Sequence, residues 1–91
     1  MLRETAAAAR REITRAKSAG VDPAFCVAAR KALEDCARMY RHKMKGLSMH
    51  EPGVRRERRA YYMTQYVLRV DAIAAVVRAY VTQVRAGRVP V

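Results

Sequence analysis

The apolar positions between Tyr61 and Val84 recur at alternating spacings of three and four residues. At about 100° per residue, this spacing places the following side chains on one narrow face of an α-helix: Met63, Tyr66, Val70, Ile73, Val77, Tyr80 and Val84. Further apolar residues widen this face: Val67, Ala74, Val76 and Val81. The residues expected to face water clearly are Arg69, Asp71, Arg78 and Arg85. Such an apolar helix is expected to form the centre of a bundle or one half of a dimer interface.

A second helix is predicted from Pro23 to about Lys45, closed by Gly46. Asp22 offers an N-cap oxygen, and Pro23 suits the first helical position. Its apolar face comprises Cys26, Ala29, Leu33, Cys36, Tyr40, Met44 and Leu47. Basic residues form a stripe about 130° around the helix from that face: Arg30, Arg38, Arg41 and Lys45. The helix is therefore expected to use one face for a core and another for anions.

The remaining segments predict an all-α fold. Residues 3–18 are rich in alanine and predict a helix with a thin apolar face, ended by Gly20. Residues 46–53 are the predicted loop, with the third helix beginning near Pro52 and followed by a short tail that closes with Pro90. We predict a single domain over residues 1–91, with helices at 3–18, 23–45 and 53–86 and the two long helices antiparallel. Because so small a domain buries only about 60 to 65 % of its unfolded surface, we expect a homodimer to complete the helical bundle.

The charge composition indicates an anionic partner. The chain has 19 Lys or Arg residues against 8 Asp or Glu, a net charge of +11, and most of the basic residues are Arg. A guanidinium makes forked contacts to phosphate that Lys does not match, so a polyanion is the default partner. The alternative is a solvated basic surface in a protein from a GC-rich genome.

Basic residues are densest around the predicted loop. The stretch from Arg38 to Arg59 has a net charge of +6, and tyrosines flank it at both ends. Phosphate contact with nearby aromatic rings is typical of nucleic-acid binding. The arginines that open the third helix oppose its dipole, which favours an external anion there. The candidate nucleic-acid-binding residues are Arg30, Arg38, Arg41, Lys45, Arg55, Arg56, Arg58 and Arg59.

The sequence shows no recognisable catalytic or metal-binding pattern. Glu34 and Asp35 point about 100° apart on a helix and form no cooperating pair. The spacings of the potential soft ligands fit no structural zinc pattern: Cys26, Cys36, His42 and His50. We therefore expect a protein that is not an enzyme and that uses neither a metal nor a cofactor.

The cysteines and the charge pattern bear on location. Cys26 and Cys36 are expected roughly 15 Å apart along one helix, too far for a disulfide between them. This favours a reducing, intracellular environment. No signal peptide is recognised, and charges interrupt the longest apolar stretch, so no membrane span is predicted.

Long helices with basic faces favour the recognition of shape over the reading of bases. A helix-turn-helix protein needs short helices joined by a tight turn, whereas an extended basic face suits the phosphates of duplex RNA. In Pro23, Leu33, Cys36, the basic run and the Glu51-Pro52 turn, the chain resembles the nodavirus-type RNA-silencing suppressors, although its third helix is longer than theirs. The resemblance implies a dimeric viral suppressor in the host cytoplasm that binds double-stranded RNA, with Arg38, Arg41 and Lys45 along the RNA.

Two other partners stay open. The basic face could dock on an acidic protein, which would make the chain a helical interaction module such as a phage or viral inhibitor or an assembly adaptor. It could also lie on an anionic membrane surface. Nuclease treatment separates the first alternative from RNA binding, because a protein partner survives it.

Overall fold

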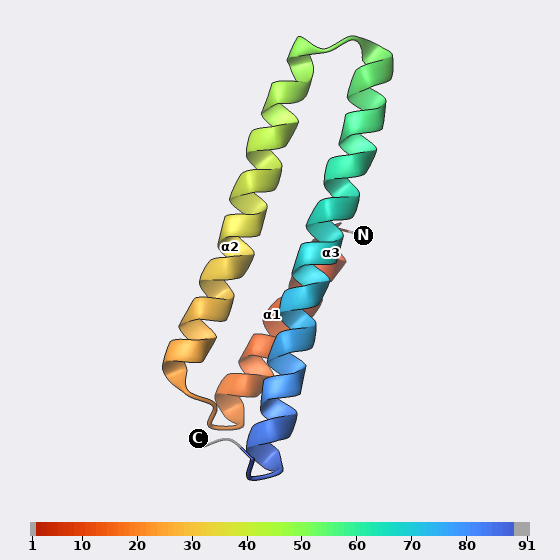
Figure 1. Ribbon diagram of the computed structural model, residues 1–91. Coiled ribbons are helices and arrows are strands. Elements are labelled where there is room, and N and C mark those ends of the chain that lie inside the picture. The colour runs from red at the N-terminus through yellow and green to blue at the C-terminus, as the bar shows by residue number, and fades with distance from the viewer. Residues whose placement is uncertain (1, 89–91) are drawn as a thin grey trace.

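The computed structural model describes residues 2–88, which form three α-helices, one short 3₁₀ helix and no strand. The elements are α1 (Leu2–Ser18), α2 (Pro23–Gly46), η1 (Leu47–Met49) and α3 (Pro52–Arg85). Figure 1 shows α2 and α3 as a long antiparallel hairpin, with α1 beside the half of it that is remote from the connecting turn. The all-α prediction is confirmed, and each predicted helix bound agrees within one residue. The tail that was expected to close with Pro90 lies outside the described residues.

Local backbone chemistry ends α1 and starts α2. Gly20 adopts φ +82°, and the Val21 N–H donates to the Ala16 carbonyl at 3.1 Å, which is the Schellman pattern for a helix C-terminus. The Asp22 carboxylate then accepts a hydrogen bond of 2.9 Å from the Ala24 N–H. These short-range signals reverse the chain within a few residues, so α1 and α2 lie antiparallel.

The connection between α2 and α3 differs from the prediction. Gly46 was expected to cap α2, but it is helical, with φ −70°, and the chain continues directly into η1. The prediction was wrong because a 3₁₀ turn can follow an α-helix without any residue in the left-handed region. Gly87, with φ +72°, does adopt the left-handed conformation just after the end of α3.

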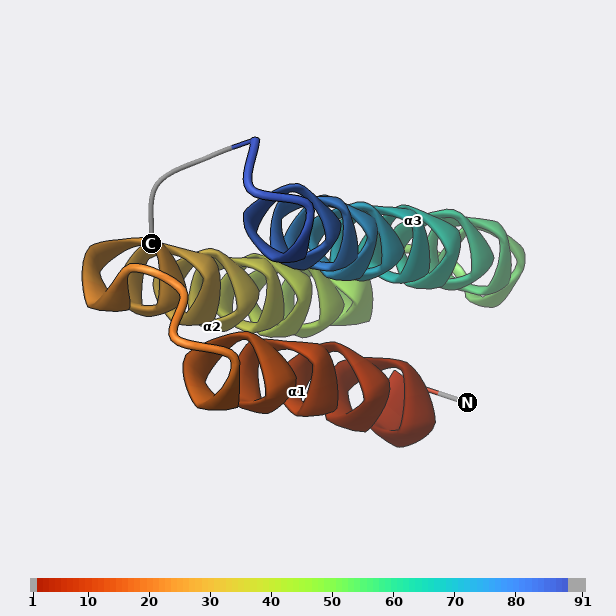
Figure 2. The same ribbon diagram turned by 90° about the horizontal axis from the view of Figure 1, so that it is seen from below.

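The core lies where all three helices meet. Seen along the bundle in Figure 2, α1 packs against one side of the α2–α3 pair. Ile13 of α1 is only 1 % exposed, as is Val77 of α3. The thin apolar face of α1 is sufficient because alanines on the facing helices allow their axes to approach closely. The buried cluster comprises Ala9, Ile13, Ala16, Val21, Cys26, Ala29, Leu33, Val70, Ala74, Val77, Val81 and Val84.

The apolar face of α3 is buried unevenly. Val70, Val77 and Val84 are buried as expected, and Ile73 is half-buried. The expectation that only charged residues of α3 clearly face water was wrong, since Val76 is 59 % exposed. The reason is geometric: α1 and α2 cover one side of α3 and leave the rest of its circumference open.

The molecule is a rod with two distinct parts. Its extents are 54 × 18 × 17 Å and its radius of gyration is 16.0 Å, whereas a compact chain of this length would have about 12 Å. We call residues 39–66, the end of the hairpin beyond α1, the arm. The rest of the described chain, residues 2–38 and 67–88, is the body. The unequal lengths of α1 and α3 create this division (Figure 1).

Candidate nucleic-acid interface

The arm is thinly packed and strongly basic. Among its residues, all of them described, Leu47 alone is buried, and none of the buried core cluster belongs to the arm. It contains 7 Lys or Arg residues and only two acidic residues, Glu51 and Glu57, which gives a net charge of +5. The ion pairs found within residues 2–88 all lie in the body. The cations of the arm therefore have no carboxylate partner in the described part of the chain.

Three of the predicted arginines share a hollow at the tip of the arm. Arg55, Arg56 and Arg59 of α3 line it together with apolar and small residues of the turn: Met44, Leu47, Ser48 and Pro52. The N-cap residue Glu51 makes no side-chain hydrogen bond to the first turn of α3. The positive end of the helix dipole and three guanidinium groups thus converge at one place, where a phosphate would be stabilised.

The other predicted residues are distributed around the rod. Arg41 lies in a shallow hollow at the start of α1, beside Arg3 and Arg10. Arg38 is held by Asp35 at 2.9 Å, but both side chains are largely exposed, so the pair exchanges readily for a phosphate contact.

Arg30, Lys45 and Arg58 are exposed. Arg30 belongs to the body, and Lys45 is near the end of α2. Arg58 does not line the tip hollow, although it lies only about 60° around α3 from Arg55. The structure therefore brings Arg55, Arg56 and Arg59 together in one hollow and leaves the remaining five predicted residues outside it.

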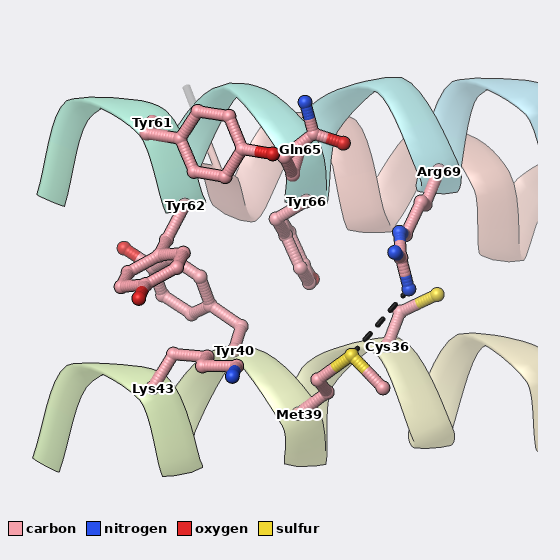
Figure 3. Close-up of a pocket in the computed structure, with 9 residues that line it drawn as sticks. All are labelled: Cys36, Met39, Tyr40, Lys43, Tyr61, Tyr62, Gln65, Tyr66 and Arg69. Carbon is pink, nitrogen blue, oxygen red and sulfur yellow. Dashed lines mark hydrogen bonds between the residues drawn. The ribbon is translucent and has the colours of Figure 1, made fainter. Parts of the chain in front are cut away.

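A second hollow lies between α2 and α3 on the side of the arm facing away from α1. We call it the tyrosine pocket; its volume is about 250 Å³. Figure 3 shows side chains from both helices converging on it, with α1 behind α3. It is lined by four tyrosines, two cations and three other residues: Tyr40, Tyr61, Tyr62, Tyr66, Lys43, Arg69, Cys36, Met39 and Gln65.

Ring contacts hold the tyrosine pocket together. The rings of Tyr40 and Tyr66 pack across the two helices with centroids 5.0 Å apart, and Tyr61 meets Tyr62 edge-on at 5.7 Å. The Lys43 ammonium lies 5.8 Å from the centroid of the Tyr62 ring, a cation–π distance. Tyr40 and Tyr66, expected in the core, are half-buried: Tyr66 packs against the edge of the core, and both residues line a shallow hollow with the start of α1, which covers them only in part.

Arg69 crosses the pocket from α3 toward α2. Its guanidinium donates a hydrogen bond of 3.4 Å to the Met39 sulfur, drawn as a dashed line in Figure 3. A thioether is a weak acceptor, so this contact leaves most of the hydrogen-bonding capacity of the guanidinium unused. Burial raises the pKa of the neighbouring Cys36 thiol above its ordinary value of 9.0, and the charge of Arg69 opposes that shift.

Lys43, Gln65 and Arg69 were absent from the predicted site. One signal was available, because Arg69 follows Tyr66 by three positions and Tyr62 by seven, which places a cation on the shoulder of the apolar face. That Arg69 meets Met39 and Cys36 depends on the register between α2 and α3, which no local pattern encodes.

Other site types find little support in the described chain. Within residues 2–88, no three His, Cys, Asp or Glu side chains are placed to share a metal ion. Both cysteines are free, Cys26 buried and Cys36 half-buried. Of the helices described, none has an apolar stretch long enough to cross a membrane.

The chain was compared with known proteins at three levels. Protein-family models, curated proteins and solved structures yielded no match.

Proposed function

We propose that the protein is a non-enzymatic nucleic-acid-binding protein that contacts the phosphate backbone through its arm, with double-stranded RNA as the favoured partner. The observation that carries the proposal is the cluster of Arg55, Arg56 and Arg59 at the tip, without a carboxylate partner among the described residues. Guanidinium groups in this setting exchange water for phosphate at little cost, because no ion pair of their own has to break.

The thickness of the arm favours shape recognition. Two packed helices with axes about 8 to 10 Å apart are roughly 20 Å across, whereas the major groove of B-DNA, about 12 Å wide, admits a single helix. The arm therefore lies across phosphates instead of inserting between bases. The wide, shallow minor groove of A-form RNA accepts such a surface, and its phosphates and 2′-hydroxyls carry little sequence information.

A protein that binds duplex RNA independently of its base sequence can cover any duplex RNA. This property supports a role as a viral suppressor of RNA silencing, the activity implied by the resemblance in α2. In the host cytoplasm, a reducing environment would keep Cys26 and Cys36 free, as they are in the structure.

A homodimer is part of the proposal. The chain exposes 6544 Å², where a compact monomer of 10.3 kDa would expose about 5,400 Å². The difference, about 1,100 Å², exceeds the roughly 800 Å² that one partner buries in a standard interface. An open apolar groove between α2 and α3 offers a surface for the second copy: Phe25, Ala28, Ala32, Ala72, Ile73 and Val76.

Fluorescence anisotropy with labelled duplex RNA, duplex DNA and single strands, from about 50 to about 300 mM salt, tests the proposal. We expect micromolar or tighter binding of duplex RNA at the lowest salt. Replacing Arg55, Arg56 and Arg59 together by Ala should weaken it about tenfold or more for every sequence alike. On duplex DNA the slope of log K against log salt should become shallower by about 0.9 for each lost phosphate contact.

The matched control removes the same charge from the body: Arg11, Lys17 and Arg85 to Ala, three exposed residues without ion pairs in the described structure. Equal weakening by both triple variants would mean that net charge alone drives binding. Failure to bind any nucleic acid at about 50 mM salt would overturn the proposal. Co-purification of an acidic protein that survives nuclease would then favour an interaction module.

A further inference from the structure

The tyrosine pocket differs chemically from the tip hollow. The tip hollow presents arginines to a nucleic-acid backbone, whereas the tyrosine pocket combines aromatic rings, one carboxamide and two cations around a partly open hollow. None of the described residues that line the tyrosine pocket is a carboxylate. A site with this lining suits a flat aromatic group that carries negative charge.

Both cations of the pocket have weak partners. Lys43 faces the Tyr62 ring at 5.8 Å, and Arg69 donates to the Met39 sulfur at 3.4 Å. Figure 3 places Lys43 toward the tip of the arm and Arg69 toward the body, with the ring of Tyr66 between them. An anionic group could therefore reach either end of the pocket without displacing a carboxylate from its cation.

The rings provide a stacking surface that is accessible. Tyr61 is 60 % exposed although it lines the pocket. Gln65, on the same helix, offers both a donor and an acceptor to the edge of a ring system. The volume of about 250 Å³ lies just below the range of roughly 300 to 1,000 Å³ typical of small-molecule sites, so the pocket accepts one ring system rather than a larger ligand.

We propose that the tyrosine pocket binds one unpaired nucleotide of the RNA held by the arm. The base stacks on the ring of Tyr61, the ring of Tyr62 meets the base edge-on, Gln65 meets the edge of the base, and Arg69, at the opposite end of the pocket from Lys43 (Figure 3), neutralises the phosphate. This inference rests on the proposed function. Because a paired base is enclosed by its neighbours in the stack, the pocket selects strand ends, bulges or overhangs within an otherwise sequence-independent complex.

The binding test compares two RNAs with the same duplex length. One is blunt, and the other carries a single unpaired nucleotide at each 3′ end. Stacking of one base predicts that the wild-type protein binds the RNA with overhangs about tenfold more tightly. Equal affinity for the two RNAs would overturn the inference and leave the proposed function intact, since blunt-duplex binding tests only the latter.

Variants assign the preference to the pocket. Tyr61→Ala and Arg69→Ala should each remove the preference for the overhang while blunt-duplex affinity changes less than about twofold. Tyr61→Phe, which keeps the ring, should retain it. Arg85→Ala removes an arginine of α3 outside the pocket and is the matched control for Arg69→Ala. If Tyr61→Ala retained the full preference, the pocket would not be the nucleotide site.

Cys36 provides a readout independent of affinity. It lines the pocket and is half-buried, whereas Cys26 is only 6 % exposed, so a maleimide should modify Cys36 first. RNA with the overhang should slow this modification, and blunt RNA should not. If adenosine monophosphate protected Cys36 from maleimide and the protein bound no RNA, the ligand of the pocket would be a free nucleotide and not a nucleotide of an RNA strand. Absence of protection by either ligand would overturn the inference as a whole.

Discussion

The body and the arm consist largely of the same two helices, yet they differ in packing and in charge. In the body, residues of three helices form the buried core, and three of its arginines pair with Glu12 or Asp35: Arg15, Arg38 and Arg78. In the arm, two helices meet through half-buried tyrosines and methionines, and its basic residues make no ion pair within the described chain. The contrast indicates that the body supplies the folding free energy while the arm carries charge that weakens it. The proposed binding surface and the core that stabilises the fold are thereby separated along the axis of the hairpin.

The strongest test of the contrast places a charge on either side of α3 in the body. Val77→Asp buries a carboxylate at a position that is 1 % exposed and should destabilise the protein by at least about 4 kcal/mol. The adjacent Val76 is 59 % exposed in the single chain and lines the groove proposed for the second copy, so Val76→Asp should remove only the stabilisation that dimerisation adds and lower the thermal unfolding midpoint far less than Val77→Asp. Circular dichroism during thermal unfolding compares the two. A similar loss of stability in both would contradict the difference in burial between the two sides of α3.

Light scattering on Val76→Asp tests the dimer separately. Val76 lines the apolar groove proposed for the second copy. The wild type is expected at twice the chain mass and the variant at the chain mass, because the carboxylate would be buried without a partner in the interface. A wild type that is monomeric at high concentration would contradict the dimer but not the role of the arm.

A smaller and local effect is expected at the tip. Leu47 is 3 % exposed, and Leu47→Ala should cost about 2 kcal/mol, at the low end for buried leucines. Hydrogen exchange should accelerate at the end of α2 and the start of α3, while amides near Ile13 and Val77 stay protected. Met49→Ala, at a position 87 % exposed, is the control. Uniform acceleration throughout the chain would mean that arm and body unfold as one unit.

The smallest predicted effect is on the alkylation rate of Cys36, which lies near the boundary between the body and the arm. Burial raises the pKa of Cys36, so its thiolate is scarcer than that of a free cysteine below pH 9.0, and alkylation should be slower there. Because the charge of Arg69 lowers this pKa, Arg69→Ala should slow alkylation further at constant pH. The raised pKa stabilises the fold below about pH 9, and this contribution is lost as pH rises through the folded-state pKa. Alkylation as fast as that of a small thiol would contradict the raised pKa of Cys36.

The sequence allowed the helix bounds to be predicted because they depend on local chemistry. Gly20 and Asp22 act through bonds to neighbours a few residues away, and those bonds are present. The division into body and arm follows from the unequal lengths of α1 and α3, which the predicted bounds already contained. The half-burial of Tyr40 and Tyr66 was missed, because helical periodicity reports which face is apolar and not how completely a partner helix covers that face.

The candidate site was predictable only in part, for a related reason. Consecutive arginines such as Arg55 and Arg56 mark the tip in any register of the hairpin. The tyrosine pocket requires Arg69 of α3 to lie opposite Met39 of α2, and this pairing is set by long-range packing in the body. Side chains that act across two helices therefore need the structure to be recognised.

The continuity of α2 and α3 has a mechanical consequence. Between Pro23 and Gly46, and again after Gly53, neither helix contains a proline or glycine at which it could bend easily. A torque applied at Arg56 is therefore transmitted along α3 to Tyr80, roughly 36 Å away at 1.5 Å per residue, where the Tyr80 ring is stacked on Phe25 at 4.2 Å. The rod therefore acts as a stiff lever: a force on the arginines at the tip also acts on the contact between Phe25 and Tyr80 at the opposite end of the molecule.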